Sequence, residues 1–309
     1  MQDQTAPARV DEGAGAAGQP DAAARGFAYA LAAYLLWGVL PIYMKAVAHI
    51  PAVEVVAHRV VWSLPIAGAV LLYLGRTADV RLAFRSPRML AMGSLTAVFI
   101  AVNWGLYVWA IAADRAVETA LGYYINPLVT VLLGAVFLGE RLTRWQAVAV
   151  GLAAGAVVVL TIEQGTLPWV SLGLAFSFGG YGYFRKTLPI GPSQGFFLEV
   201  ALLFPLALGY LLWLAMRGEG HFLDGINPWL LMFAGPATSI PLILYAFGAK
   251  LLRISTIGIM QYITPTMIAA MAVFLFGEPF GTARAAAFAL IWVALLLYTW
   301  SSLRARREG

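Results

Sequence analysis

The sequence predicts an all-α polytopic membrane protein whose ten transmembrane helices form two inverted five-helix repeats. Three observations lead to this fold class. Of the 309 residues, 61% are hydrophobic and only 11% are charged, whereas soluble proteins carry roughly 25% charged residues. Ten apolar stretches follow one another along the chain, and each is about long enough to cross a bilayer core of ~30 Å as a helix. Finally, one segment of the first half recurs in the second.

The composition also excludes several classes of protein. A water-soluble fold of this composition would expose large apolar patches, so lipid must solvate most of the surface. The chain contains no cysteine, which excludes disulfides, thiolate-bound metals and cysteine nucleophiles. The net charge of +5 does not indicate nucleic acid, because the basic residues lie mainly at the ends of the apolar stretches. The expected partners are the lipid bilayer and a small-molecule substrate, and a homo-oligomer is left open.

The segments follow in a regular order. Residues 1–25 are rich in Ala, Gly, Pro and Gln, and we expect a disordered cytoplasmic tail there. A first repeat is expected over 26–162, a second over 168–303, and a basic cytoplasmic tail over 304–309. The apolar stretches within the repeats cover 26–47, 53–75, 89–112, 118–138, 145–162, 168–184, 193–215, 228–249, 255–276 and 284–303.

The basic residues predict an orientation, because cytoplasmic loops of membrane proteins hold an excess of Lys and Arg. With the N-terminus inside, 15 of the 20 basic residues fall in inner segments, and only Arg115, Arg217 and Arg284 fall in outer loops. Adding or removing one helix would scramble this alternation. The sequence therefore predicts ten spans in the inner (plasma) membrane, with both termini cytoplasmic.

An internal repeat indicates how the two halves are related. A shift of 138 positions aligns residues 122–140 with 260–278 without a gap, and the pattern Tyr-Ile-x-Pro occurs in both. Each half contains five spans, an odd number, so the second copy must cross the membrane in the opposite direction. Inverted repeats are typical of alternating-access carriers, whose substrate site lies near the midplane. Gene duplication without transport is the simpler alternative.

Two prolines in the repeated segment are expected to kink their helices. Pro127 and Pro265 lack an N–H group and press on the preceding turn, which frees a backbone carbonyl near mid-membrane. Such carbonyls are tolerated where they line a polar cavity. The adjacent Asn126 and the nearby Gln261 favour a cavity here.

Charged side chains at membrane depth are the first candidates for function, because burying charge in lipid is costly. We expect Arg59 to attract an anionic or carboxylate-bearing group, with His58 titrating and Glu54 orienting one of them. Arg59 is equally suited to a structural role, in which its long side chain reaches the outer headgroups or forms an ion pair with Glu54 or Glu118 that fixes helix packing. If protons are exchanged for substrate, the available titrating groups are Glu54, His58, Glu118 and Glu199.

One asymmetry favours function over packing. A shift of 145 positions places Glu54 on Glu199, yet the basic pair His58–Arg59 then matches Leu203–Phe204. A purely symmetric scaffold would not require a basic pair in one half alone.

Aromatic and amide side chains at similar depth complete the predicted site, since broad aromatic faces suit aromatic or drug-like compounds. Glu140 and Glu278 each follow a glycine at a helix end and are interpreted as caps or gate contacts. The predicted substrate-binding residues are Arg59, His58, Asn103, Trp104, Tyr107, Tyr123, Tyr124, Asn126, Gln261, Tyr262, Trp37 and Tyr181.

Several motifs make the chain resemble the RarD group of the EamA family, in the drug/metabolite transporter superfamily. They are WGVLPIYMK (37–45), HRVVWS (58–63), LGYYINPL (121–128), FLGERL (137–142), GLAFSFGGYG (173–182) and QYITPT (261–266). The resemblance implies a ten-helix inner-membrane carrier of two inverted halves. It also implies relatives that export amino acids, other small metabolites or drugs, in a group named for chloramphenicol sensitivity. It assigns no binding residues.

The predicted function is therefore secondary-active export. The residues needed for an intramembrane enzyme are missing. His49, His58 and His221 share no metal-binding spacing. Ser63 lies roughly 140° around the helix from His58, a poor geometry for a serine–histidine pair. No cofactor or metal is expected, and the sequence has no phosphate-binding loop of the ATPase kind. A passive channel is the better alternative, but it needs a continuous polar pore.

Overall fold

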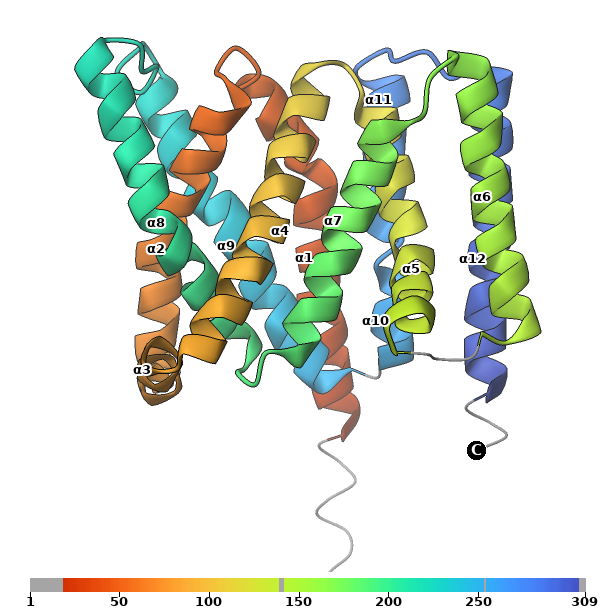
Figure 1. Cartoon of the computed structure of the whole chain (residues 1–309), viewed down its shortest axis with the longest axis horizontal. Helices are drawn as coiled ribbons and strands as arrows, with labels where there is room; N and C mark the ends of the chain where they lie inside the picture. Colours follow the sequence, from red (N-terminus) through yellow and green to blue (C-terminus); the bar gives the residue numbers. More distant parts are fainter. Residues whose placement is uncertain (1–18, 139–141, 253, 306–309) are drawn as a thin grey trace, which may run out of the picture.

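The computed structural model describes residues 19–138, 142–252 and 254–305, which form twelve helices. The long helices stand side by side and run between the two ends of a broad bundle (Figure 1). Those of the first half are α1 (Gln19–Ala46), α2 (Ala52–Tyr73), α3 (Thr77–Arg85), α4 (Pro87–Ala112), α5 (Ala116–Leu138) and α6 (Arg144–Gln164). Those of the second half are α7 (Trp169–Thr187), α8 (Pro192–Arg217), α9 (Asn227–Leu251), α10 (Ile254–Met260), α11 (Ile263–Phe274) and α12 (Thr282–Ala305).

The fold is that of a multi-pass membrane protein. Within the described part of the chain, eight helices are long and apolar enough to cross a membrane, namely α1, α2, α4, α5, α6, α8, α9 and α12. The helix α7 and the pair α10–α11 are not among these eight. A total of ten spans therefore requires counting both as crossings, and it stays a prediction.

The ninth predicted stretch, 255–276, is not one helix. α10 ends at Met260 and α11 begins at Ile263. Pro265 accounts for the break, because its ring clashes with the carbonyl of residue 261 and it has no N–H to bond there. Pro265 therefore lies in the first turn of α11 instead of kinking a continuous helix. Pro127, in contrast, lies inside α5, which continues through it.

The helices at the chain ends are longer than the sequence predicts. α1 begins at Gln19, so residues 19–25 are helical and do not belong to the tail expected over 1–25. A proline close to the helix start and the alanine run Ala22–Ala24 explain this, since both favour a helix at those positions. Likewise, α12 continues to Ala305, into the basic tail expected over 304–309.

The short helix α3 was not predicted. It lies between α2 and α4 and buries only Val80 and Ala83 against the bundle. Its nine residues include two arginines, so no apolar stretch marks it in the sequence. A pattern of this kind indicates a helix that lies along a surface.

Both ends of the described chain lie at one end of the bundle, here called the lower end, which also holds α3 (Figure 1). The end of α5, the start of α6 and the loop from α7 to α8 lie there too, and the opposite end is the upper end. The lower end carries the arginines in and next to α3 and those at the starts of α4 and α6. Arg115, Arg217 and Arg284 lie at helix ends or loops of the upper end.

Helices of the two halves pack against each other throughout the bundle. α2 contacts α8, α5 contacts α11, and α6 contacts α12; α1 packs on α9, and α4 packs on α7. The largest buried apolar cluster joins both halves, with residues such as Met44, Ile111, Leu121, Leu231 and Ile268. This cluster packs together the helices that carry the candidate site.

Candidate substrate-binding site

The candidate site is centred on Arg59 of α2, which is only 4% exposed. Its guanidinium carbon lies 4.7 Å from the ring centroid of Trp104 in α4, and Nε donates to Oγ1 of Thr238 in α9 at 3.0 Å. The Nη1 atom is buried and has no hydrogen-bond partner among the described residues. Leaving a buried charged donor unbonded is unfavourable. The arrangement thus offers a directional donor to an anionic ligand.

Three tyrosines lie around this guanidinium. Tyr43 of α1, Tyr107 of α4 and Tyr123 of α5 are all close enough to interact with it electrostatically. The rings of Tyr107 and Tyr123 are 6.0 Å apart. The Tyr107 hydroxyl is buried without a partner in the described part of the chain, so it provides a second polar group for a ligand. The Tyr43 hydroxyl is occupied, because it donates to the Leu230 carbonyl at 2.8 Å.

The two carboxylates that the sequence offers to Arg59 have other partners. Glu54 accepts from the backbone N–H of His221 at 2.8 Å, and its other oxygen lies 2.7 Å from Nδ1 of the same histidine. Glu118 pairs with Arg115 of the preceding turn, at 3.0 Å. Neither forms an ion pair with Arg59, so these contacts do not support the packing interpretation of that arginine.

His58 points away from Arg59, toward the loop between α8 and α9. Its ring stacks on Phe222 with centroids 5.1 Å apart, and Nδ1 accepts from Nε1 of Trp62 at 3.2 Å. Because consecutive residues of a helix lie about 100° apart, His58 and Arg59 face different neighbours. Glu54, His58 and His221 therefore form an upper cluster, distinct from the surroundings of Arg59.

Asn103 belongs to the site through its hydrogen bonds. Its amide nitrogen donates to the Leu174 carbonyl at 3.2 Å and to Oγ of Ser177 at 3.0 Å, both in α7. Its amide oxygen accepts from the Tyr123 hydroxyl at 3.3 Å. Asn103 thus fixes α4 to α7 and orients Tyr123. Nearby, the buried Oδ1 of Asn126 has no partner among the described residues.

Four other predicted residues lie in separate clusters. The Tyr124 hydroxyl is 2.5 Å from Oγ1 of Thr266, and its ring stacks on Tyr262 at 6.4 Å, so this pair faces α11. Trp37 packs against Tyr245 between α1 and α9. Gln261 lies at the break between α10 and α11, where it is half-buried. These residues do not contact Arg59.

Tyr181 and Glu199 form a cluster between α7 and α8. The Tyr181 hydroxyl donates to Oε2 of Glu199 at 3.1 Å, and Nε of Arg185 lies 3.4 Å from Oε1. Gly195 makes room for Arg185, since a Cβ there would lie 1.8 Å from its guanidinium. Phe178 lies 6.0 Å from Tyr123 and 5.9 Å from Tyr181, measured between ring centroids. A row of aromatic rings thus connects the Arg59 surroundings to Glu199.

Sequence reasoning missed Thr238 and Tyr43. The signal for Thr238 was a Thr-Ser pair inside an otherwise apolar span, and both Thr238 and Ser239 are buried. Tyr43 lies in the WGVLPIYMK segment, but its chemistry gave no sign of contact with α2.

Glu278 is a helix cap. Its two oxygens accept from the N–H groups of Ala116 and Val117, at 2.6 and 2.9 Å, at the start of α5. A carboxylate there also interacts favourably with the positive end of the helix dipole. This confirms the interpretation as a cap for Glu278, whereas Glu140 lies outside the described residues.

Comparison with known proteins identifies the family of the chain. Residues 24–162 match the EamA-like transporter family. A protein named RarD from Streptomyces exfoliatus is 44% identical over 92% of this chain and 91% of that protein. The chain belongs to the RarD group of the EamA-like transporter family. Another member, the uncharacterized transporter YojE of Bacillus subtilis, is 39% identical over 92% of this chain and 97% of its own length. This RarD-group chain is therefore a membrane transporter.

Two further similarities add detail. A Pseudomonas aeruginosa protein named chloramphenicol-sensitive protein RarD is 35% identical over 92% of this chain and 96% of its own length. A crystal structure with a TM-score of 0.55 and 19% identity covers 94% of this chain and 99% of its own. At that identity the second similarity shows the fold alone.

Proposed function

We propose that this RarD-group chain is a secondary-active carrier that exports small metabolites, amino-acid-like compounds or drugs across the inner membrane by alternating access. The observation that carries the proposal is the enclosed guanidinium of Arg59, which faces the indole of Trp104. Within the described part of the chain, its Nη1 and the nearby hydroxyl of Tyr107 have no hydrogen-bond partner. These groups fit a molecule that combines a carboxylate or other anion with an aromatic or apolar body.

The packing of the helices supports alternating access. If the second half is an inverted copy of the first, α1 corresponds to α7 and α4 corresponds to α9. Exchanging the halves then converts the contact of α1 with α9 into that of α7 with α4, and both contacts are present. The pairs α2–α8, α5–α11 and α6–α12 each consist of two corresponding helices. Their contacts are therefore unchanged when the halves are exchanged. Two halves related in this way can exchange inward-open and outward-open arrangements around a shared site.

The enclosure of Arg59 favours a carrier over a passive channel. Its side chain contacts α4 and α9, and three tyrosines lie around it. A channel needs a continuous polar path past such a group. In a carrier the group is reached only when the halves move. The excess of arginine at the lower end supports placing that end, with both termini, in the cytoplasm.

Counterflow in proteoliposomes tests the proposal. The full chain is reconstituted, loaded with one compound of a panel of metabolites and drugs that includes chloramphenicol, and exposed to a trace of the labelled compound outside. We expect saturable uptake that internal substrate accelerates, because a carrier must return through its binding site. Uptake that shows neither saturation nor trans-stimulation would indicate a channel. Liposomes without protein provide the control.

A further inference from the structure

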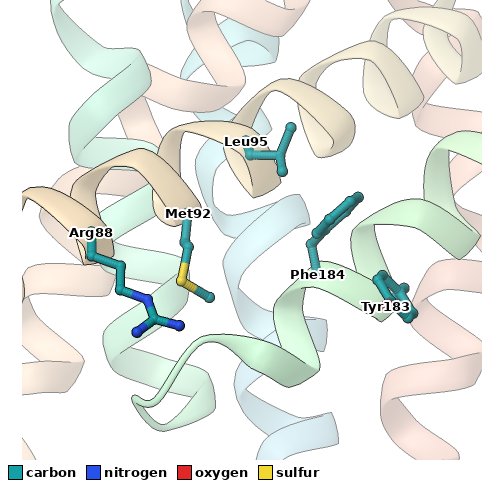
Figure 2. Close-up of a pocket in the computed structure, with 5 residues that line it drawn as sticks. All are labelled: Arg88, Met92, Leu95, Tyr183 and Phe184. Carbon is teal, nitrogen blue, oxygen red and sulfur yellow. The ribbon is translucent and has the colours of Figure 1, made fainter. Parts of the chain in front are cut away.

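A groove lies between α4 and α7 toward the lower end of the bundle. It has a volume of about 410 Å³ and is lined by Arg88, Met92, Leu95, Tyr183 and Phe184. Figure 2 shows the first three following one another along α4, with the two aromatic residues across from them on α7. At 1.5 Å per residue, Arg88 and Leu95 lie roughly 10 Å apart along the helix. The groove thus carries a cation at the helix end and apolar side chains further in.

The groove ends before the candidate substrate site. Phe99 of α4 stacks on Phe184 of α7, with ring centroids 5.5 Å apart. At Gly180 the backbone of α7 comes so close that a Cβ there would lie 2.6 Å from the Phe99 ring. Phe99 lies one turn before Asn103 on α4, so this aromatic contact separates the groove from the hydrogen bond between Asn103 and Ser177. A molecule in the groove would not reach Arg59.

The same corner of the molecule carries uncompensated positive charge. Arg76, Arg81 and Arg85 lie in or next to α3, which packs against α4 and α8. Together with Arg88 they are four exposed arginines, and none of them forms an ion pair within the described ranges. The acidic residue of α3, Asp79, accepts instead from Nε2 of Gln194 at 2.9 Å.

Apolar side chains are exposed beside these arginines. Leu82 is 63% exposed and Phe84 is 42% exposed, both on α3. A short helix that presents both apolar and basic residues is typical of the interface between acyl chains and headgroups. This places the mouth of the groove at the depth of the phospholipid headgroups.

We propose that the groove between α4 and α7 binds an anionic phospholipid of the surrounding bilayer. The phosphate would lie at Arg88, with α3 supplying further positive charge, and an acyl chain would lie along Met92, Leu95 and Phe184. Clusters of four to eight basic residues next to a span are typical of acidic-lipid recognition. A soluble anion would leave the apolar wall of the groove unused, and an apolar molecule would leave Arg88 unused. Bound lipid would stabilise the contact between α4 and α7.

Native mass spectrometry of the full chain in detergent tests this site. The probes are phosphatidylglycerol and phosphatidylethanolamine with identical acyl chains. We expect the protein to retain phosphatidylglycerol preferentially, and Arg88→Gln to weaken that retention about fivefold, the contribution of one basic residue near an anionic surface. Arg144→Gln is the matched control. Arg144 is an exposed arginine at the same end, in the first turn of α6, and its replacement should leave retention unchanged.

A second variant tests whether lipid retention depends on the shape of the groove or only on the charge of the surface. Leu95→Trp narrows the groove without changing any charge, and Leu95 is 40% exposed, so the larger ring has room to avoid a clash with the core. We expect it to reduce phosphatidylglycerol retention as well, with the melting temperature in detergent unchanged.

Three results would overturn the proposal. Equal retention of both lipids by the unaltered protein would remove the preference for negative charge. Weaker phosphatidylglycerol retention in Arg88→Gln but not in Leu95→Trp would mean that the arginines attract the lipid as general surface charge, without a built groove. Displacement of the lipid by soluble glycerol phosphate at similar concentration would assign the groove to a soluble anion. None of these results bears on counterflow, so the lipid site and the proposed carrier function are tested separately.

Discussion

The helices α2 and α8 contact each other and correspond in sequence, yet they carry different chemistry. Glu54 and Glu199 match at a shift of 145 positions, each is 1% exposed, and each binds a polar partner near its own helix start. One turn further on, α2 has His58–Arg59 where α8 has Leu203–Phe204, which pack on an apolar cluster. The carboxylate belongs to the framework of both halves. Of the matched positions 59 and 204, only that of α2 carries a guanidinium, which lies beside Trp104 of α4.

The largest effect should come from removing this asymmetry. Arg59→Leu makes α2 resemble α8, and we expect counterflow to fall roughly 30-fold or more, because the anionic group of the substrate would lose a buried charged partner. The measurement is the initial rate per folded protein in proteoliposomes. Arg59→Lys should retain part of the rate, and Phe204→Leu, at the matched position of α8, should retain nearly all of it. Normal transport by Arg59→Leu would make that arginine a packing residue.

A smaller effect should distinguish the two matched carboxylates. Both oxygens of Glu54 already interact with His221, so protonating it would break a hydrogen bond. Oε1 of Glu199 has no hydrogen-bond partner among the described residues and lies 3.4 Å from Nε of Arg185, so protonating it would weaken this ion pair but break no hydrogen bond at that oxygen. If protons are exchanged for substrate, transport should vary by up to about tenfold per pH unit, the slope for one titrating group.

We expect Glu199→Gln to flatten this dependence and Glu54→Gln to preserve it. The rate is measured in proteoliposomes over a series of external pH values. An unaltered pH profile in Glu199→Gln would exclude it as the coupling group, and a flat profile in Glu54→Gln would reverse the assignment.

The smallest effect should come from matched glycines at the helix contacts. Gly235 of α9 and Gly93 of α4 face α2 and α8, respectively. A Cβ at Gly235 would lie 2.4 Å from the backbone oxygen of Trp62, whereas at Gly93 it would lie 2.8 Å from a methyl group of Leu198. A side chain can move aside more easily than a backbone. Gly235→Ala should therefore lower stability by about 1–3 kcal/mol.

Gly93→Ala should be nearly neutral, because alanine favours the helix by about 1 kcal/mol and offsets a small repacking. Melting temperatures of both variants in the same detergent provide the comparison. Equal losses would contradict the difference between backbone and side-chain contact.

Parts of the site could be predicted from the sequence, because a charged residue inside an apolar stretch is visible without knowing its neighbours in space. Arg59 was found since a charge inside an apolar stretch requires a partner, and Trp104, Tyr107 and Tyr123 do lie near it. The partner of Glu54 could not be predicted, because His221 is 167 positions away. Thr238 was missed for the same reason. Tyr124 and Tyr262 were expected at the site, but the side of α5 on which a residue lies depends on its neighbours.

The sequence by itself determined the class of fold, the approximate helix positions and the family, because apolar length, basic loops and internal similarity are properties of the chain. The tertiary structure alone decided where α10 and α11 separate, which carboxylate caps α5, and which polar atoms at Arg59 have no hydrogen-bond partner among the described residues. The physical reason is that lipid selects helices by composition, whereas hydrogen bonds and side-chain contacts depend on distances between residues that only packing sets.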